Sequence, residues 1–409
     1  MTTPTLYFVI ISGHNLPSLI PILETQPEKV VLIVTSFFAG KSPPELFKQQ
    51  IKNNLPATEI EMLSSENLGG ECLTEMEAWS QKHFCPYFDQ HKDDYRCILN
   101  MTGGTKILPL VLETLVDWDE VHYKGQKIEF LQRWQVKNKT RVPLDNLQLS
   151  QIPPLVGLNL YTETTEGSTN RIDQLPQAAN TAQVIWNYYQ DYADTGTENI
   201  HIDLSKRLAD VWLELDKYQE KKVMIPWSEF DHSPEELAPW LKQLSTLTPP
   251  DLDPILTLSN HGVEIPGNKL GSSKRGKLRD DWKDWISGLW LETLTHTWLQ
   301  ELNIEIATSV KIKNRKRELD FVLMHQHALH VIEAKAAPSP QGAPSDIIRQ
   351  IKSVDAIGML QNYLLISPYF SKVDYIKAQQ FDDFKKSCKQ NKIKLLSSKE
   401  ELLDVFTPQ

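Results

Sequence analysis

Residues 96–106 read RCILNMTGGTK, and this stretch decides the fold of the N-terminal part of the chain. Its first half, Arg96–Met101, predicts a short buried strand, and the apolar segment Ile107–Val116 after it predicts a helix. The residues between them are polar or glycine: Thr102, Gly103, Gly104, Thr105 and Lys106. The stretch therefore predicts a strand, a glycine loop and a helix in succession, which is the repeating unit of an α/β fold.

Two more strands are predicted upstream of this unit. Leu6–Ile11 and Val30–Val34 are continuous apolar runs. Such runs are typical of strands that are buried on both faces of a parallel sheet. Leu16–Thr25, which lies between them, predicts the crossover helix that joins parallel strands. We therefore expect an N-terminal Rossmann-like domain with a mainly parallel sheet.

Loops that follow parallel strands meet at one edge of the sheet, and ligands bind there where the strand order changes. The candidate ligand-binding residues lie in three such loops: Ser12, Gly13, His14 and Asn15; Thr35 and Ser36; and Thr102, Gly103, Gly104, Thr105 and Lys106. Paired glycines let backbone amides approach an anion, and hydroxyls and a lysine can bind phosphate. The glycine loop has neither the GxxxxGK[ST] nor the GxGxxG pattern, so hydrolysis of a nucleoside triphosphate is not supported. A plain tight turn between strand and helix remains the alternative interpretation of the two glycines.

A helix with one charged residue on an apolar face is predicted over Trp282–Leu302. The residues on that face follow steps of three and four: Trp285, Leu289, Glu292, His296 and Leu299. Burial of an unpaired carboxylate is costly, so we expect Glu292 to face a cation or a wet site. The alternative is a partly exposed glutamate at the edge of the core.

A hairpin is predicted from the two apolar runs Leu319–Met324 and Ala328–Ala336. If its turn consists of Gln326 and His327, Asp320 lies directly opposite Glu333. Opposed carboxylates destabilise a sheet, and a divalent cation bound between them is the usual compensation.

These residues together predict a site for phosphodiester hydrolysis. Asp320, Glu333 and the carbonyl of Ala334 would coordinate Mg2+ or Mn2+, and Glu292 would support a ligand water or a second ion. Lys335 projects from the same face of its strand as Glu333 and would position the attacking water. Glu292, Asp320, Glu333 and Lys335 are therefore the candidate catalytic residues.

Charge is distributed unevenly along the 409 residues, whose formal net charge is -10. Residues 1–269 hold 22 basic and 36 acidic side chains, whereas residues 270–409 hold 21 and 17. The negative net charge argues against a wholly basic protein that coats nucleic acid. The uneven distribution predicts that a polyanion, if one binds, contacts the C-terminal part. The basic side chains there that could follow a phosphate backbone, or form a solvated surface, are Lys274, Arg275, Lys277, Arg279, Lys311, Lys313, Arg315, Lys316 and Arg317.

The division into domains follows from these patterns. We expect the Rossmann-like domain at 1–150, a linker or small helical connecting region at 151–270, and a second domain with the predicted hydrolytic site at 271–409. Helices are predicted in the connecting region at Ala178–Tyr192, Leu204–Tyr218 and Glu235–Leu244, the last started by Ser233 and Pro234.

The surroundings of the protein are also predicted from composition. No apolar run approaches the roughly 18 residues that span a bilayer, so we expect no membrane partner. The four cysteines have neither disulfide-framework nor zinc-site spacing, so a reducing cytoplasm is the expected compartment.

Residues 100–106, NMTGGTK, resemble the signature of the CRISPR-associated Rossmann fold (CARF) domain, a sensor of cyclic oligoadenylates in type III CRISPR immunity. The resemblance covers residues 1–150. It implies a homodimer whose two sensor domains share one ring-shaped ligand, usually cyclic tetra-adenylate, bound by the three loops.

The C-terminal pattern resembles the PD-(D/E)xK core of restriction-endonuclease-like enzymes. It consists of Glu-Leu-Asp320 followed by Glu333-Ala-Lys335, with Leu319 standing where the motif name has proline. Both resemblances together imply an allosteric nuclease of antiviral defence that cleaves single-stranded DNA, RNA or both, or nicks DNA. Two alternatives remain: a non-catalytic, ligand-sensing regulator that binds nucleic acid, and an unregulated DNA endonuclease.

Overall fold

The structure is a computed structural model of the chain. It describes residues 3–64, 68–69, 72–104, 107–125, 129–138, 140–165, 178–195, 222–230, 233–245, 257–266, 288–313, 318–336, 362–368 and 378–407. Thr105 and Lys106 of the glycine loop, the predicted helix Leu204–Tyr218, the basic run Lys274–Arg279 and residues 314–317 lie outside these ranges.

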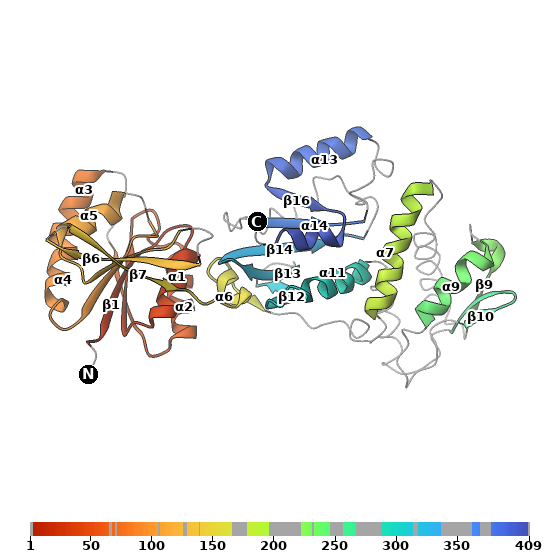
Figure 1. Cartoon of the computed structure of the whole chain (residues 1–409), viewed down its shortest axis with the longest axis horizontal. Coiled ribbons are helices and arrows are strands. Elements are labelled where there is room, and N and C mark those ends of the chain that lie inside the picture. The colour runs from red at the N-terminus through yellow and green to blue at the C-terminus, as the bar shows by residue number, and fades with distance from the viewer. Residues whose placement is uncertain are drawn as a thin grey trace.

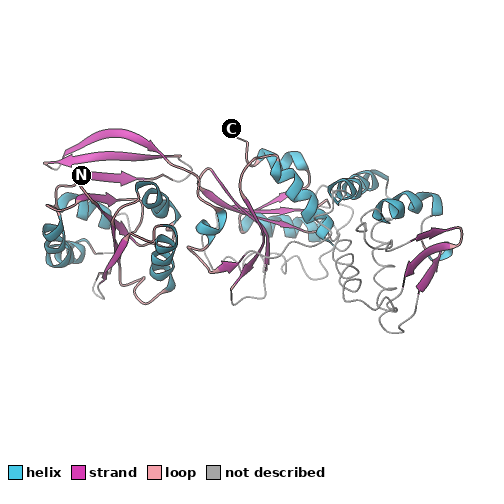
Figure 2. Cartoon of the chain, turned by 90° about the horizontal axis from the view of Figure 1, so that it is seen from below, coloured by secondary structure: helices cyan, strands magenta, loops and turns pink. Residues whose placement is uncertain are grey.

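The N-terminal domain is built on a seven-stranded sheet of order β3-β2-β1-β4-β5-β6-β7. Its strands are β1 (Thr5–Ile10), β2 (Lys29–Val34), β3 (Glu59–Ser64), β4 (Arg96–Asn100), β5 (Glu120–Tyr123), β6 (Phe130–Lys137) and β7 (Thr140–Gln148). The first five strands are parallel, and β6 and β7 add an antiparallel hairpin at one edge (Figure 2). The predicted α/β class with a mainly parallel sheet is therefore confirmed.

Helices cover both faces of this sheet, and β1 is therefore buried on both sides. Tyr7 and Val9 face α1 (Leu16–Thr25) and α2 (Ser42–Asn54). Leu6, Phe8 and Ile10 face the opposite helical layer. That layer consists of α3 (Leu73–Trp79), a π-helical turn (Ser80–Phe84), α4 (Cys85–His91) and α5 (Ile107–Leu115). The continuous apolar runs of the sequence are explained by this two-sided burial.

The C-terminal domain is built on a six-stranded sheet of order β16-β15-β14-β13-β12-β8. Its strands are β8 (Thr164–Thr165), β12 (Ile306–Ile312), β13 (Glu318–His325), β14 (Ala328–Ala334), β15 (Asn362–Ile366) and β16 (Ile393–Leu396). The helices α11 (Trp290–Gln300) and α14 (Lys399–Asp404) pack on one face, and residues of α13 (Ala378–Gln390) pack on the other.

Parts of the connecting region contribute to the C-terminal domain. The strand β8 pairs with β12, and α7 (Ala178–Thr195) packs against α11, where the rings of Trp186 and Trp298 meet edge to face at 4.9 Å. A separate three-stranded sheet of β9 (Lys222–Pro226), β10 (Thr257–Ser259) and β11 (Gly262–Pro266) lies beside α9 (Pro234–Ser245) (Figure 1). The domain limits at 150 and 270 stay a prediction.

The helix α9 begins as predicted. The Ser233 hydroxyl accepts a hydrogen bond from the amide of Glu236, whose carboxylate accepts one from the amide of Ser233. This reciprocal pair is a capping box, and Pro234 occupies the first helical position.

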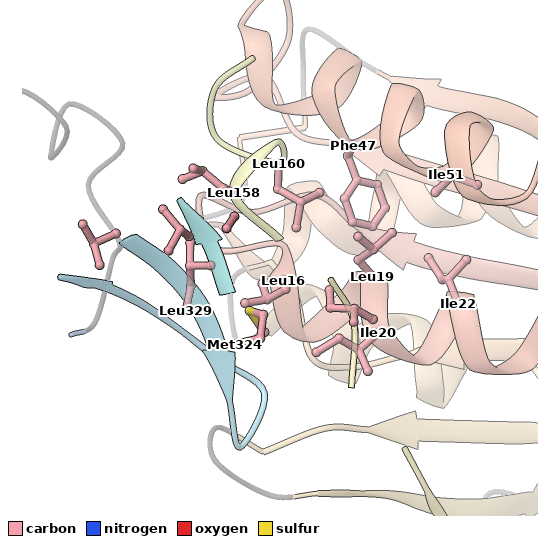
Figure 3. Close-up of a cluster of buried hydrophobic side chains, with 14 of the residues drawn as sticks. Leu16, Leu19, Ile20, Ile22, Phe47, Ile51, Leu158, Leu160, Met324 and Leu329 are labelled. Carbon is pink, nitrogen blue, oxygen red and sulfur yellow. The ribbon is translucent and has the colours of Figure 1, made fainter. Parts of the chain in front are cut away.

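The short helix α6 (Pro154–Leu158) lies between the N-terminal and C-terminal sheets (Figure 1). One apolar cluster runs without interruption from Leu16 and Leu19 of α1, through Leu158, to Met324 and Leu329 of the C-terminal hairpin (Figure 3). The two domains therefore share a continuous buried contact.

Within the described ranges, none of the helices combines the length and the apolar character that a membrane crossing requires.

Candidate functional sites at the hairpin and the sensor edge

The hairpin β13–β14 has the predicted turn and register. Gln326 and His327 form the turn with positive φ angles of 48° and 59°, as a two-residue turn matched to strand twist requires. The pairs run from His325 opposite Ala328 to Phe321 opposite Ile332. Asp320 and Glu333 are the residues that follow this last pair on their two strands.

Lys335 joins the two carboxylates. Its Nζ lies 3.0 Å from Oε2 of Glu333 and 3.5 Å from Oδ2 of Asp320. The same Asp320 oxygen accepts a hydrogen bond of 2.7 Å from the backbone amide of Ala334. The amide of Lys335 donates to the carbonyl of Ile366 on β15, which fixes the chain at the end of β14. Two carboxylates and one ammonium group therefore converge at this end of the hairpin.

Burial shifts the pKa values of the charged groups in this cluster. Glu333 is 8% exposed, and its burial together with the charge of Asp320 raises its pKa to about 7. Burial acts to lower the pKa of Lys335, but the charges of Glu333 and Asp320 outweigh it and raise that pKa. A second positive charge would stabilise both carboxylates in their ionised form.

Glu292 lies in the first turn of α11, at the flank of the helix and not on its core face. The buried residues of this helix are Trp290, Leu291, Leu294, Thr295, Trp298 and Leu299. The apolar face predicted through Leu289, Glu292 and His296 is therefore not the buried face of the helix, and the half-buried Glu292 agrees with the alternative of a partly exposed glutamate at the edge of the core. Trp290 and Trp298 are almost fully buried and belong to the core. The charge of Glu292 nevertheless contributes to the raised pKa of Lys335.

The donors at the hairpin suit a hard divalent cation. They are the carboxylate oxygens of Asp320 and Glu333 and the backbone carbonyl of Ala334. Among the described residues, no three His, Cys, Asp or Glu side chains lie close enough together to hold a metal ion. Glu292 therefore does not complete a three-carboxylate group, and a bound cation would need backbone oxygen or water as further ligands. His325, His327 and His330 lie in the turn and strands, and His325 and His330 pack against Phe406.

The second candidate site is the carboxyl edge of the N-terminal sheet. Strand order changes between β1 and β4, so the loop Ser12–Asn15 after β1 and the loop Thr102–Gly104 after β4 flank the crevice where such sheets bind ligands. Thr35 and Ser36 follow β2 at the same edge.

Close packing explains both glycines of the second loop. A Cβ atom on Gly103 would lie 2.3 Å from the carbonyl oxygen of Ile10, and one on Gly104 would lie 2.4 Å from the Ile10 side chain. Gly104 also has a φ of +83°, which side-chain-bearing residues rarely adopt. The glycines are therefore required for the close approach to β1, whether or not the loop binds an anion.

Hydrogen bonds fix the shape of this edge. The Asn15 side-chain oxygen accepts the amide of Ser12 at 2.8 Å, and the Ser12 hydroxyl interacts with the backbone of His14. Asn100 accepts the amide of Thr102 at 2.8 Å, and the Thr102 hydroxyl accepts the amide of Lys124 at 2.9 Å.

Sequence reasoning missed Lys124 at this edge. It follows β5, is 2% exposed, and has a pKa that burial lowers to about 8. The strand before it, Glu120–Tyr123, has only four residues and no continuous apolar run, so its carboxyl end was not recognisable. A search for lysines after every short strand candidate would have included it.

Comparison with known proteins identifies the fold. No protein-family model matches the chain, and no curated protein matches its sequence. The structure of Can2 from Sulfobacillus thermosulfidooxidans in complex with cyclic tetra-adenylate matches with a TM-score of 0.64 and 18% identity, over 99% of this chain and 100% of that chain. The crystal structure of VC1899 from Vibrio cholerae matches with a TM-score of 0.69 and 14% identity, over 98% of this chain and 96% of that chain. The chain therefore shares, over nearly its whole length, a fold in which a Rossmann-like domain precedes a second α/β domain.

Proposed function

We propose that the chain is a metal-dependent nuclease activated by a cyclic oligoadenylate, most simply cyclic tetra-adenylate, in type III CRISPR defence. The observation that carries this proposal is the convergence of Asp320, Glu333 and Lys335 at one end of a hairpin. The fold shared with a protein solved in complex with cyclic tetra-adenylate supports the assignment of the activator.

The chemistry proposed for the hairpin is phosphodiester hydrolysis. A bound Mn2+ or Mg2+ would supply Lewis-acid stabilisation of the negative charge on the transition-state phosphate. Asp320 and Glu333 would hold that cation with the carbonyl of Ala334, and Glu292 would orient a water near it. Lys335, which already contacts both carboxylates, would hold the attacking water by hydrogen bonding, and its charge opposes the effect of burial on the pKa of Glu333.

The sensor edge is proposed to bind the phosphates and riboses of the ring. Ser12, Gly13, His14 and Asn15, with Thr35, Ser36, Thr102, Gly103 and Gly104, line the edge at which such sheets bind ligands. Thr105 and Lys106 are proposed to complete it, although they lie outside the described residues. A ring with two-fold symmetry suits a homodimer in which each chain supplies half of the site.

Activation requires that the ring bind the cleavage-competent arrangement better than any other. The continuous apolar cluster between the N-terminal domain and the hairpin supports such coupling, because close-packed side chains transmit a displacement from one side to the other.

The test is a cleavage matrix with the full-length protein. Labelled single-stranded DNA, single-stranded RNA and plasmid DNA are incubated with Mn2+, with and without cyclic tetra- or hexa-adenylate. We expect cleavage that depends on the metal and whose rate increases when one of the two cyclic oligoadenylates is added. Binding of the ring without loss of any substrate would support a non-catalytic regulator, and cleavage that ignores both rings would support an unregulated endonuclease.

A further inference from the structure

The segment between the two sheets contacts the loop after β1 at one end and the β13–β14 hairpin at the other. After α6, the chain passes through Tyr161 to β8, where Thr164 and Thr165 pair with Ile312 and Lys311 of β12. The side chain of Asn159 accepts hydrogen bonds of 2.9 and 2.8 Å from the amide and hydroxyl of Thr164. This end of the segment is therefore held within the C-terminal sheet.

Tyr161 reaches from this segment to the sensor edge. Its hydroxyl lies 3.0 Å from Nδ1 of His14, and the two rings stack with their centroids 6.3 Å apart. The backbone of Leu16, at the start of α1, also hydrogen-bonds to Tyr161. Burial raises the pKa of Tyr161 and lowers that of His14, which favours the uncharged form of each, and a phenol can donate to a neutral imidazole.

The other end of the segment packs on the hairpin. A Cβ atom on Gly157 would lie 3.2 Å from the sulfur of Met324 and 3.6 Å from methyl carbons of Leu16 and Leu329. The helix α6 thus contacts α1, β13 and β14 at once, as Figure 3 shows for the surrounding side chains. Leu329 and Glu333 are four residues apart on β14, so they project from the same face about 13 Å from each other.

We propose that Tyr161 is the positioning residue that couples the Ser12–Asn15 loop to the β13–β14 hairpin. This inference rests on the proposed function, in which that loop meets the ring and that hairpin carries the cleavage site. The hydrogen bond to His14 ties the position of Tyr161 to the loop, and α6 and β8 tie it to the strands that carry Asp320 and Glu333. A coupling carried by one half-buried hydrogen bond between neutral groups corresponds to a change of about threefold to tenfold.

The test compares Tyr161→Phe with Tyr87→Phe in the full-length protein. Phenylalanine keeps the ring and removes only the hydroxyl. Tyr87 is the matched control because its hydroxyl donates to Glu61 within the sensor domain. Three quantities are measured: the affinity for cyclic tetra-adenylate by calorimetry, the ratio of stimulated to basal cleavage with Mn2+, and ligand-induced change in hydrogen exchange over residues 320–334.

We expect Tyr161→Phe to bind the ring but to lose about threefold to tenfold of the stimulation, with a smaller exchange response in the hairpin. Tyr87→Phe should match the wild type in all three. Equal stimulation and equal exchange response in wild type and Tyr161→Phe would overturn the inference alone. A wild type that neither binds the ring nor responds to it would remove the proposed function and this coupling together.

Discussion

At the scale of residues, the proposed activity depends on the pair of carboxylates on the hairpin. Asp320 and Glu333 are adjacent and share Lys335 as their cation in the described structure. Two buried like charges held by one ammonium group are costly, and a site with this cost is more readily explained by cation binding than by stability.

Glu333→Gln should therefore separate stability from metal binding. The substitution keeps the shape and removes one of two opposed charges, so we expect unfolding free energy without metal to rise by about 1 kcal/mol. Added Mn2+ should then raise the melting temperature of the wild type and not of the variant. Glu305→Gln, at an exposed position of the same domain, serves as the control and should behave as the wild type does.

A second prediction concerns the glycine loop. In Gly103→Ala, the new methyl would meet the Ile10 carbonyl oxygen at 2.3 Å, so we expect a loss of about 1–3 kcal/mol in chemical denaturation. Gly288→Ala is the control, because its Cβ would lie 4.0 Å from Ala336, an ordinary contact. Equal stability of the two variants would show that the loop can move away from β1.

At the scale of elements, the hairpin turn is a pH-sensitive part of the domain contact. His327 is 7% exposed, and burial together with the charge of Lys124 lowers its pKa to about 4, against the opposing effects of the Leu149 backbone and Glu24. In the unfolded chain, His327 has its ordinary pKa of about 6.5 and therefore binds a proton at a higher pH than in the folded protein. The contribution of neutral His327 to stability is therefore complete above about pH 6.5 and is lost as the pH falls toward 4.

His327→Asn should reduce this pH dependence, since asparagine tolerates the positive φ of the turn. We expect the wild type to lose at most about 3 kcal/mol more than the variant between pH 7 and pH 4, and less where solvent screens the group. Thermal unfolding across that range measures the difference. Parallel curves for both proteins would contradict the buried, neutral state of His327.

The elements that could be predicted from the sequence are those with continuous apolar runs, or those joined by a short turn. The strands β1, β2 and β4, the helix α1 and the hairpin β13–β14 agree with their predictions within a residue or two. β7 could not be recognised in the same way, because most of its side chains are exposed or half-exposed and carry no apolar run. The face of α11 was misjudged because the contact of α7 with α11, about a hundred residues apart in sequence, decides which side is buried.

At the scale of the whole molecule, the sequence predicts the local arrangement of the hairpin but not its contacts with the N-terminal domain. The opposition of Asp320 and Glu333 follows from a two-residue turn, which is local. The contacts of α6 and Tyr161 with the sensor edge join residues up to 147 positions apart, as between His14 and Tyr161, and no periodicity predicts them. Such contacts join the two domains through buried and half-buried side chains.

The most direct test of the account compares wild type and Asp320→Asn with Mn2+, single-stranded nucleic acid and saturating cyclic tetra-adenylate. The account predicts ring-stimulated cleavage by the wild type and a loss of at least about a hundredfold in the variant. Calorimetry should show that both proteins bind the ring equally, since Asp320 lies outside the sensor domain. Undiminished cleavage by Asp320→Asn would contradict the central claim that the hairpin carboxylates form the catalytic site.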